Sequence, residues 1–310
     1  MENKISIRKF VFGIAAMCVV VVGFFLYERR EVVAPTSDTV SVVTSFYPLY
    51  FFASEIGGEG VQVHNITPAG AEPHEYEPTT QDMLKIEKSD LLILNGGGLE
   101  PWGDKVIDTL SGSAARVVTV GTKLADREFV EDGAPVTDPH IWLSPVLAKE
   151  EVKEILRGFI AVDPDHAATY EKNAAVLLEK LDLLNEAFTN GLAQCDHRDI
   201  VTSHAAFSYL AAAYGLRQVP ISGLSPEGEP SPRQMAEVAD FIRKNKITYI
   251  FFESLVSPKF SDTLAQEVGV QTLVLNPLEG LTRNEIVAGK TYFTEMRLNL
   301  ANLRTALQCQ

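Results

Sequence analysis

Residues 163–192 read DPDHAATYEKNAAVLLEKLDLLNEAFTNGL and predict the longest helix of the chain. Asp163 is a typical N-cap residue, and Pro164 suits the first helical position. Apolar residues then recur at spacings of four or three residues, at Tyr170, Ala174, Leu177, Leu181, Leu184, Phe188 and Leu192. This spacing places one apolar stripe on a helix of about 28 residues, or about 42 Å. Because the helix stands between two similar halves of the sequence, we expect a rigid strut; the alternative is a core helix of one lobe.

On either side of this helix, short β-branched runs alternate with helical patterns. The predicted strands are 40–45, 61–67, 91–95 and 117–120 before the helix, and 199–203, 218–222, 248–253 and 271–276 after it. This alternation indicates βαβ units and parallel sheets. The halves also echo each other, since residues 43–46 read VTSF and residues 201–204 read VTSH. We therefore predict an α/β protein with two similar lobes.

The length of 310 residues fits this organisation, because two domains of about 100–150 residues can each bury a core. The predicted segments are a membrane anchor or signal over 1–30, a tether over 31–39, an N-terminal lobe over 40–162, the linking helix over 163–192 and a C-terminal lobe over 193–310. The net charge of −14 argues against a nucleic-acid partner, whose phosphates need basic side chains. An acidic body suits a cationic ligand.

Residues 10–27 form a run of 18 residues without a charge, preceded by Lys4, Arg8 and Lys9. This layout is typical of an export signal whose N-terminus stays in the cytoplasm. An uncleaved anchor, a cleaved signal peptide and a lipoprotein signal around Cys18 are the three interpretations. Each of them places the body outside the cytoplasm. In an oxidising compartment, Cys195 and Cys309 are able to form a disulfide; the alternative is two unrelated thiols.

Three of the six histidines share a context. His74, His140 and His204 each lie where a strand or loop ends and a helix is about to begin. In parallel α/β sheets, ligands bind at the carboxyl ends of the strands, so the three side chains are candidates to meet in the cleft between the lobes. Neutral imidazole binds Zn²⁺, and also Cu²⁺, Ni²⁺ and Fe²⁺. The candidate acceptors for the other ring nitrogens are Glu72, Glu75, Asp138 and Glu253.

The histidines stand in recognisable motifs. Residues 45–49 read SFYPL, residues 71–78 read AEPHEYEP, residues 138–145 read DPHIWLSP and residues 202–207 read TSHAAF. Together they resemble the zinc/manganese solute-binding proteins of ABC importers, also called cluster A-I, from about residue 40 to the C-terminus. The resemblance implies two Rossmann-like lobes joined by a rigid long helix, with the metal in the cleft between them. It also implies His74, His140 and His204 as the first three ligands, and a histidine at the third position is similar to the zinc branch.

The sequence departs from this family in two places. The family usually has an aspartate as fourth ligand in a motif like Leu-Asp-Pro-Leu, whereas residues 275–279 here read LNPLE. We therefore expect the fourth position or its surroundings to involve water, Asn276 or Glu279, with Glu75 and Glu253 as further carboxylate candidates. Many zinc members carry a histidine-rich loop before the second ligand. Residues 124–137 here hold four acids and no histidine, so we do not expect a second metal site there.

The function predicted from these observations is capture of extracytoplasmic zinc and its delivery to the transmembrane subunit of an ABC permease. The chain would be a monomer held at the membrane by residues 10–27, without nucleic acid and without a catalytic step. The alternatives are a manganese or ferrous iron carrier of the same fold, a three-histidine zinc hydrolase, and a purely adhesive or structural role. A hydrolase would need a water on the open fourth position of the ion.

Overall fold

The computed structural model describes residues 39–131 and 133–310. The predicted anchor over residues 10–27, Cys18 and most of the tether lie outside the described residues. Within the described residues, no helix is long and apolar enough to cross a membrane. Residues from Thr39 to the C-terminus form one compact unit that contains two parallel sheets.

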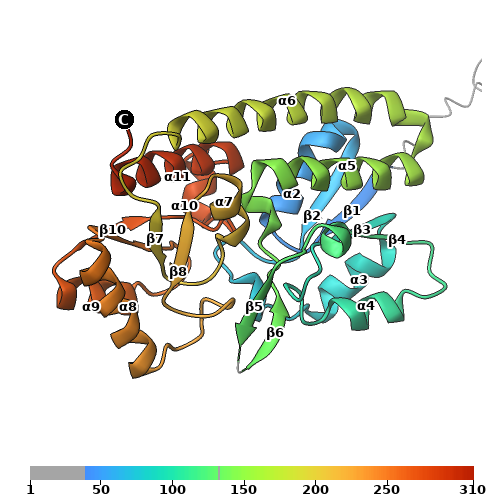
Figure 1. Cartoon of the computed structure of the whole chain (residues 1–310). Coiled ribbons are helices and arrows are strands. Elements are labelled where there is room, and N and C mark those ends of the chain that lie inside the picture. The colour runs from blue at the N-terminus through green and yellow to red at the C-terminus, as the bar shows by residue number, and fades with distance from the viewer. Residues whose placement is uncertain (1–38, 132) are drawn as a thin grey trace, which may run out of the picture. The chain divides into compact units, whose positions relative to one another are not determined.

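The first sheet has the strand order β2-β1-β3-β4 and the second has the order β10-β9-β7-β8 (Figure 1). The strands are β1 (Val40–Thr44), β2 (Val61–Asn65), β3 (Leu91–Leu94), β4 (Arg116–Thr119), β7 (Asp199–Thr202), β8 (Arg217–Pro220), β9 (Tyr249–Phe252) and β10 (Gln271–Val274). All pairings within these two sheets are parallel. Matching β1 to β7, β2 to β8, β3 to β9 and β4 to β10 gives the same order in both lobes. The predicted repetition of one α/β plan is therefore confirmed, although the exact lobe boundaries stay predictions.

Each sheet is covered by helices on both faces, because its strands are apolar on both sides. In the first lobe, Val42 and Ile93 pack under α2 (Tyr47–Gly57) and α5 (Pro145–Val162), and the opposite face of the sheet packs on α3 (Thr80–Lys88) and α4 (Gly103–Thr109). In the second lobe, Val201 and Ile250 pack on one pair of helices, while Ile200 and Phe251 face the other. The first pair is α8 (Pro232–Asn245) and α9 (Lys259–Val268), and the second pair is α7 (Ser208–Ala213) and α11 (Tyr292–Leu307). The short helix α10 (Arg283–Val287) has no buried residue.

The long helix α6 (Ala167–Gly191) connects the two lobes. All seven predicted stripe residues are buried. The helix packs on α2 and α5 of the first lobe and on α11 of the second, and it runs above both sheets in Figure 1. It begins later than predicted, because residues Pro164–His166 form a separate 3₁₀ turn, η5. The Asp163 carboxylate binds the ring of His166 and the hydroxyl of Tyr170 and does not cap the backbone.

A single hydrophobic core extends around α6 from one lobe to the other. It includes Phe52 and Phe159 of the first lobe, Phe188 of α6, and Tyr292 and Leu303 of the second lobe. Cys195 and Cys309 form the expected disulfide, which joins the segment after α6 to the end of α11. Because the bridge closes a loop with a sequence separation of 114 residues, loop-closure entropy gives it about 4–5 kcal/mol of stabilisation. Both features favour two lobes that keep a fixed arrangement.

Residues 124–137, expected to be an acidic loop, contain a two-stranded antiparallel hairpin of β5 (Glu128–Glu131) and β6 (Ala134–Thr137). The hairpin leads directly into the segment that carries His140. It lies between the two sheets in Figure 1. Capping boxes start two of the helices, at Thr79 for α3 and at Ser231 for α8. The helix predicted directly after His204 is shorter, because α7 begins only at Ser208.

One buried carboxyl lies in the shared core without a partner. Glu151 of α5 is fully buried, and neither of its carboxylate oxygens has a hydrogen-bond partner within the described chain. Burial raises the pKa of Glu151 well above its ordinary value of 4.5. Burial also raises the pKa of the neighbouring Tyr292, and the charge of Glu151 raises it further. Glu151 is therefore a destabilising residue of the interior.

Replacing Glu151 with Met should stabilise the protein. At about pH 4, where the carboxyl carries its proton in both states, we expect the free energy of unfolding to rise by about 1–3 kcal/mol, since an unpaired buried polar group is removed. The folded state holds its proton above pH 4.5, where the unfolded state releases it. The wild type should therefore lose stability relative to Glu151→Met as pH rises above about 4.5, by up to about 1.4 kcal/mol per pH unit.

Urea unfolding between pH 4 and pH 8 measures this gap. The control is Glu150→Met, which removes a carboxylate of the same helix that pairs with Lys153 near the surface. It should change stability by about 0.5 kcal/mol or less. The prediction would be contradicted if the free energy of unfolding of Glu151→Met were lower than that of the wild type across this pH range.

Candidate metal centre

Three histidines from different elements converge between the lobes. His74 lies in the 3₁₀ turn η2 (Pro73–Glu75) after β2, His140 directly precedes the 3₁₀ turn η4 (Ile141–Leu143), and His204 follows β7. The ring centroids of His74 and His140 are 5.3 Å apart, and those of His140 and His204 are also 5.3 Å apart. The rings of His140 and His204 are buried, and that of His74 is 9% exposed. The histidines proposed from the sequence therefore lie in one enclosed cluster.

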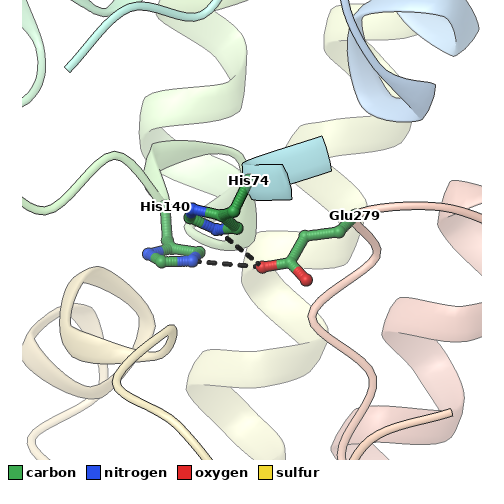
Figure 2. Close-up of side chains that lie close together, drawn as sticks. All are labelled: His74, His140 and Glu279. Atoms are coloured by element: carbon green, nitrogen blue, oxygen red, sulfur yellow. Dashed lines mark hydrogen bonds and ion pairs between the residues drawn. The ribbon is translucent and has the colours of Figure 1, made fainter. Parts of the chain in front are cut away.

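Glu279 of the second lobe faces all three rings. Its Oε1 atom lies 3.5 Å from Nε2 of His74, 3.1 Å from Nε2 of His140 and 3.3 Å from Nε2 of His204. Figure 2 shows the carboxylate pointing at His74 and His140 from the opposite side of the site. In a tetrahedral zinc site with bonds of about 2.0–2.1 Å, neighbouring donor atoms are about 3.3 Å apart. The three distances from Oε1 of Glu279 to the histidine nitrogens are close to this value, and Glu279 belongs both to a close group of donors with His74 and His140 and to one with His204 and Glu253.

Several metal-donor atoms of this cluster are buried and form no hydrogen bond within the described residues. Nε2 of His74, Nε2 of His204 and Oε2 of Glu279 are buried without a hydrogen-bond partner in the described residues. A buried polar atom without a partner costs free energy, so native proteins rarely leave three in one place. A divalent cation would satisfy these atoms together.

Two carboxylates orient the rings. Oδ1 of Asp138 lies 2.8 Å from Nδ1 of His140, and Oε1 of Glu253 lies 2.7 Å from Nδ1 of His204. A proton shared with a carboxylate stays on Nδ1, so the Nε2 lone pair of each ring is directed into the site. The Ser203 hydroxyl donates to Glu253 at 2.6 Å, and the Ser208 hydroxyl donates to Asp138. Both carboxylates were sequence candidates for this role, and they are buried.

The charges within the cluster support one another. Burial alone would raise the pKa of Glu279, but His204, His140 and His74 hold that pKa well below its usual range. Burial lowers the pKa of His204, yet the adjacent Glu253 and Glu279 outweigh it and raise the pKa well above the ordinary value. For His74, burial dominates and lowers the pKa. Glu279 is therefore ionised and is ready to compensate a bound cation.

Glu72 is a second carboxyl beside this cluster. Its Oε1 accepts a hydrogen bond of 3.1 Å from the backbone N–H of His74. Burial and the nearby charge of Glu279 raise the pKa of Glu72 to about 10. Glu72 is therefore protonated near neutral pH, holds the turn that carries His74, and adds no second negative charge next to Glu279.

A constrained turn aims Glu279 at the site. Leu278 is buried and has a φ of 60°, a left-handed conformation that branched apolar residues rarely adopt. Its N–H donates to Oδ1 of Asn276 at 2.8 Å, which is the hydrogen bond of an Asx turn. From the first lobe, the indole N–H of Trp142 donates to the Pro277 carbonyl at 2.7 Å. This strain is held at the binding site by its surroundings, as is typical of functional positions.

Asn276 thus serves the turn, and its side chain has no free atom to offer a metal. Its Nδ2 donates to Glu295 at 3.2 Å. Its backbone N–H donates to Oδ1 of Asn299 in α11 at 2.8 Å, and its carbonyl accepts from Nδ2 of Asn299 at 2.7 Å. Of the other candidates, Glu253 orients His204, and Glu75 is exposed in η2. The anchoring residues Trp142 and Asn299 were not predicted, because no local pattern connects them with Glu279.

The remaining histidines lie apart from the cluster. His166 is exposed beside Asp163 at the start of α6. His64 is a half-buried residue of β2, and His197 is half-buried between α6 and β7. None of these three histidines therefore belongs to the cluster of His74, His140 and His204.

Three imidazoles and one carboxylate lie enclosed between two α/β lobes with the same strand order, and imidazole and carboxylate are donors that divalent transition metals take in proteins. The comparison with known families agrees. The chain belongs to the family described as "Zinc-uptake complex component A periplasmic", whose model matches residues 42–306.

Similar proteins include the zinc-binding lipoprotein AdcA of Streptococcus pneumoniae, 42% identical over 276 residues that make up 86% of this chain and 55% of AdcA. The chain thus spans about half the length of that relative. The high-affinity zinc uptake system protein ZnuA of Bacillus subtilis is 36% identical and is covered over 88% of its length, with 87% of this chain. The crystal structure of the Zn(II)-bound ZnuA-like domain of S. pneumoniae AdcA superposes with a TM-score of 0.76 at 42% identity, covering 87% of this chain and 99% of that domain.

The role of Asn276 is tested by introducing the aspartate that the family usually has. Asn276→Asp removes the Nδ2 donor and places a carboxylate against the buried Glu295, so the free energy of unfolding should fall by about 1–3 kcal/mol. The double variant Asn276→Asp/Glu295→Gln restores a donor opposite Asp and should recover part of this loss. Urea unfolding of both variants provides the measurement. A single variant as stable as the wild type and with tighter zinc binding would instead make residue 276 a ligand.

Proposed function

We propose that this protein captures one zinc ion outside the cytoplasm and delivers it to an ABC-type permease. His74, His140, His204 and Glu279 are the proposed ligands. The observation that carries the proposal is the position of Glu279 Oε1, 3.1–3.5 Å from the Nε2 atoms of all three histidines. Membership of the zinc-uptake family and the zinc-bound state of the AdcA domain support it.

The donor set favours zinc over the alternative cargoes. Three neutral nitrogens and one carboxylate oxygen suit the tetrahedral coordination of Zn²⁺, whereas Mn²⁺ prefers oxygen ligands at an octahedral site. Fe²⁺ also binds imidazole, but its affinity for a given site is generally lower than that of Zn²⁺. Manganese and ferrous iron are therefore weaker candidates than zinc.

The same donor set argues for a carrier without a catalytic step. Catalytic zinc sites keep three protein ligands and leave the fourth position to a water that becomes the nucleophile. Here Glu279 occupies the direction in which such a water would stand, and His140, His204 and Glu279 are buried. A zinc ion with four protein ligands is well retained and poorly suited to hydrolysis.

The location and partners follow from the same family. The Cys195–Cys309 disulfide and the periplasmic component named in the family description support a place outside the cytoplasm. The transmembrane subunit of the permease is the proposed partner, with residues 10–27 attaching the chain to the membrane. We propose that the protein acts as a monomer, with two lobes around one ion.

Isothermal titration calorimetry, with Zn²⁺ or Mn²⁺ titrated into metal-free protein, tests the site. Zn²⁺ should bind with a stoichiometry of one, and Mn²⁺ should bind at least about 100-fold more weakly, as the donor preferences predict. His74→Ala, His140→Ala, His204→Ala and Glu279→Gln should each weaken zinc binding by about 100-fold or more, since one of four ligands is lost. His166→Ala is the matched control and should bind zinc like the wild type. Equal affinities for all five variants would contradict the proposed site.

A further inference from the structure

The hairpin of β5 and β6 reaches from the first lobe onto the second. The burial of β5 alternates, so that Glu128 and Val130 are exposed while Phe129 and Glu131 are half-buried. Phe129 shares a hollow with Pro220 and Phe241 of the second lobe. The Phe129 and Glu131 side of the strand therefore faces the second lobe, whereas Glu128 and Val130 are the more exposed residues of the strand.

At the end of this strand, Oε1 of Glu131 accepts a hydrogen bond of 2.6 Å from the backbone N–H of Leu224, which lies 93 residues away in the second lobe. The approach depends on Gly223. The three atoms nearest to a Cβ built at Gly223 all belong to Glu131, the closest being Oε1 at 2.1 Å. A side chain at residue 223 would therefore push the carboxylate away from Leu224.

Both ends of this contact are connected to ligand-bearing segments. The carbonyl of Gly223 accepts a hydrogen bond of 2.8 Å from Ala205, the residue after His204. On the other side, β6 runs into Asp138 and His140, and the N–H of Asp138 donates to the Arg127 carbonyl at 2.9 Å to close the base of the hairpin. The hydrogen bond between Glu131 and Leu224 thus joins the segment of His140 to the segment of His204.

The base of the hairpin is also fixed on the second lobe. The hydroxyl of Tyr209 in α7 accepts from the N–H of Arg127 at 3.0 Å and donates to the carbonyl of Asp138 at 3.0 Å. The hairpin is therefore held on the second lobe at its base by Tyr209 and near its tip by Glu131. Charged acceptors take part at both places, because the Ser208 hydroxyl of α7 donates to the Asp138 carboxylate at the base and Glu131 accepts near the tip. Hydrogen bonds to charged groups are the stronger kind.

We propose that Glu131 is a positioning residue for ion retention: its hydrogen bond to Leu224 ties the two lobes together over the metal centre and slows the release of zinc. The inference rests on the proposed function. Glu131 touches no ligand, so it acts on the separation of the histidine-bearing segments and not on the coordination sphere. Its removal should increase the dissociation rate and leave the stoichiometry at one.

Stopped-flow dissociation of zinc into excess chelator tests the proposal in the full chain. Glu131→Ala should release zinc about tenfold faster than the wild type, the factor that loss of one hydrogen bond to a charged group gives. The matched control is Glu128→Ala, which removes the same charge from an exposed position of the same strand and should release zinc at the wild-type rate. Equal release rates for both variants would overturn the proposal.

A second variant keeps the test independent of the folding of the hairpin. Gly223→Ala displaces the carboxylate without changing β5, and Gly223 has no positive φ that would strain an alanine. It should also accelerate release, and Glu131→Ala/Gly223→Ala should be no faster than Glu131→Ala, because both changes remove one interaction. If the two changes accelerated zinc release additively, they would act separately, and the proposed role of the Glu131–Leu224 hydrogen bond would be rejected.

Hydrogen exchange of the Leu224 amide separates this proposal from the proposed function. In metal-free protein, exchange of this amide should be faster in Glu131→Ala than in the wild type and unchanged in Glu128→Ala. If the wild type fails to bind zinc, the proposed function is wrong, and unchanged Leu224 exchange would then also reject the contact. If the wild type binds zinc and Glu131→Ala does not accelerate release, only the retention role is wrong.

Discussion

One buried carboxylate holds the site together. Glu279 lies within 3.1–3.5 Å of three imidazole nitrogens, two from the first lobe and one from the second, whereas Asp138 and Glu253 each pair with one ring. The Asx turn at Asn276, the left-handed Leu278 and the bond from Trp142 to Pro277 all act on the direction of this side chain. The strain of the turn is offset by the buried contacts around it.

The fold supplies a frame stiff enough for this geometry. The helix α6, the common core around it and the Cys195–Cys309 bridge connect the lobes on the side of the long helix, while the hairpin of β5 and β6 connects them beside the metal centre. A donor set spread over two lobes binds tightly only if the lobes keep their separation.

Much of this was readable in the sequence, since strands buried on both faces and the stripe from Tyr170 to Leu192 are strong periodic signals. Local pattern also indicated the three histidines at strand ends. It could not choose between Asn276 and Glu279, because that choice depends on the turn at Leu278 and on Asn299 of α11, which contact the segment only in the folded chain. The hairpin was missed although residues 128–131 and 134–137 flank an Asp-Gly pair, a recognised hairpin signal.

The central claim is that three imidazoles and the Glu279 carboxylate complete the coordination of one zinc ion. X-ray absorption at the zinc edge of the loaded protein measures the ligands directly. The account predicts four-coordinate zinc with three imidazole nitrogens and one oxygen at about 2.0–2.1 Å, and loss of one imidazole in His204→Ala. A six-coordinate spectrum dominated by oxygen, or an imidazole count unchanged in His204→Ala, would contradict it.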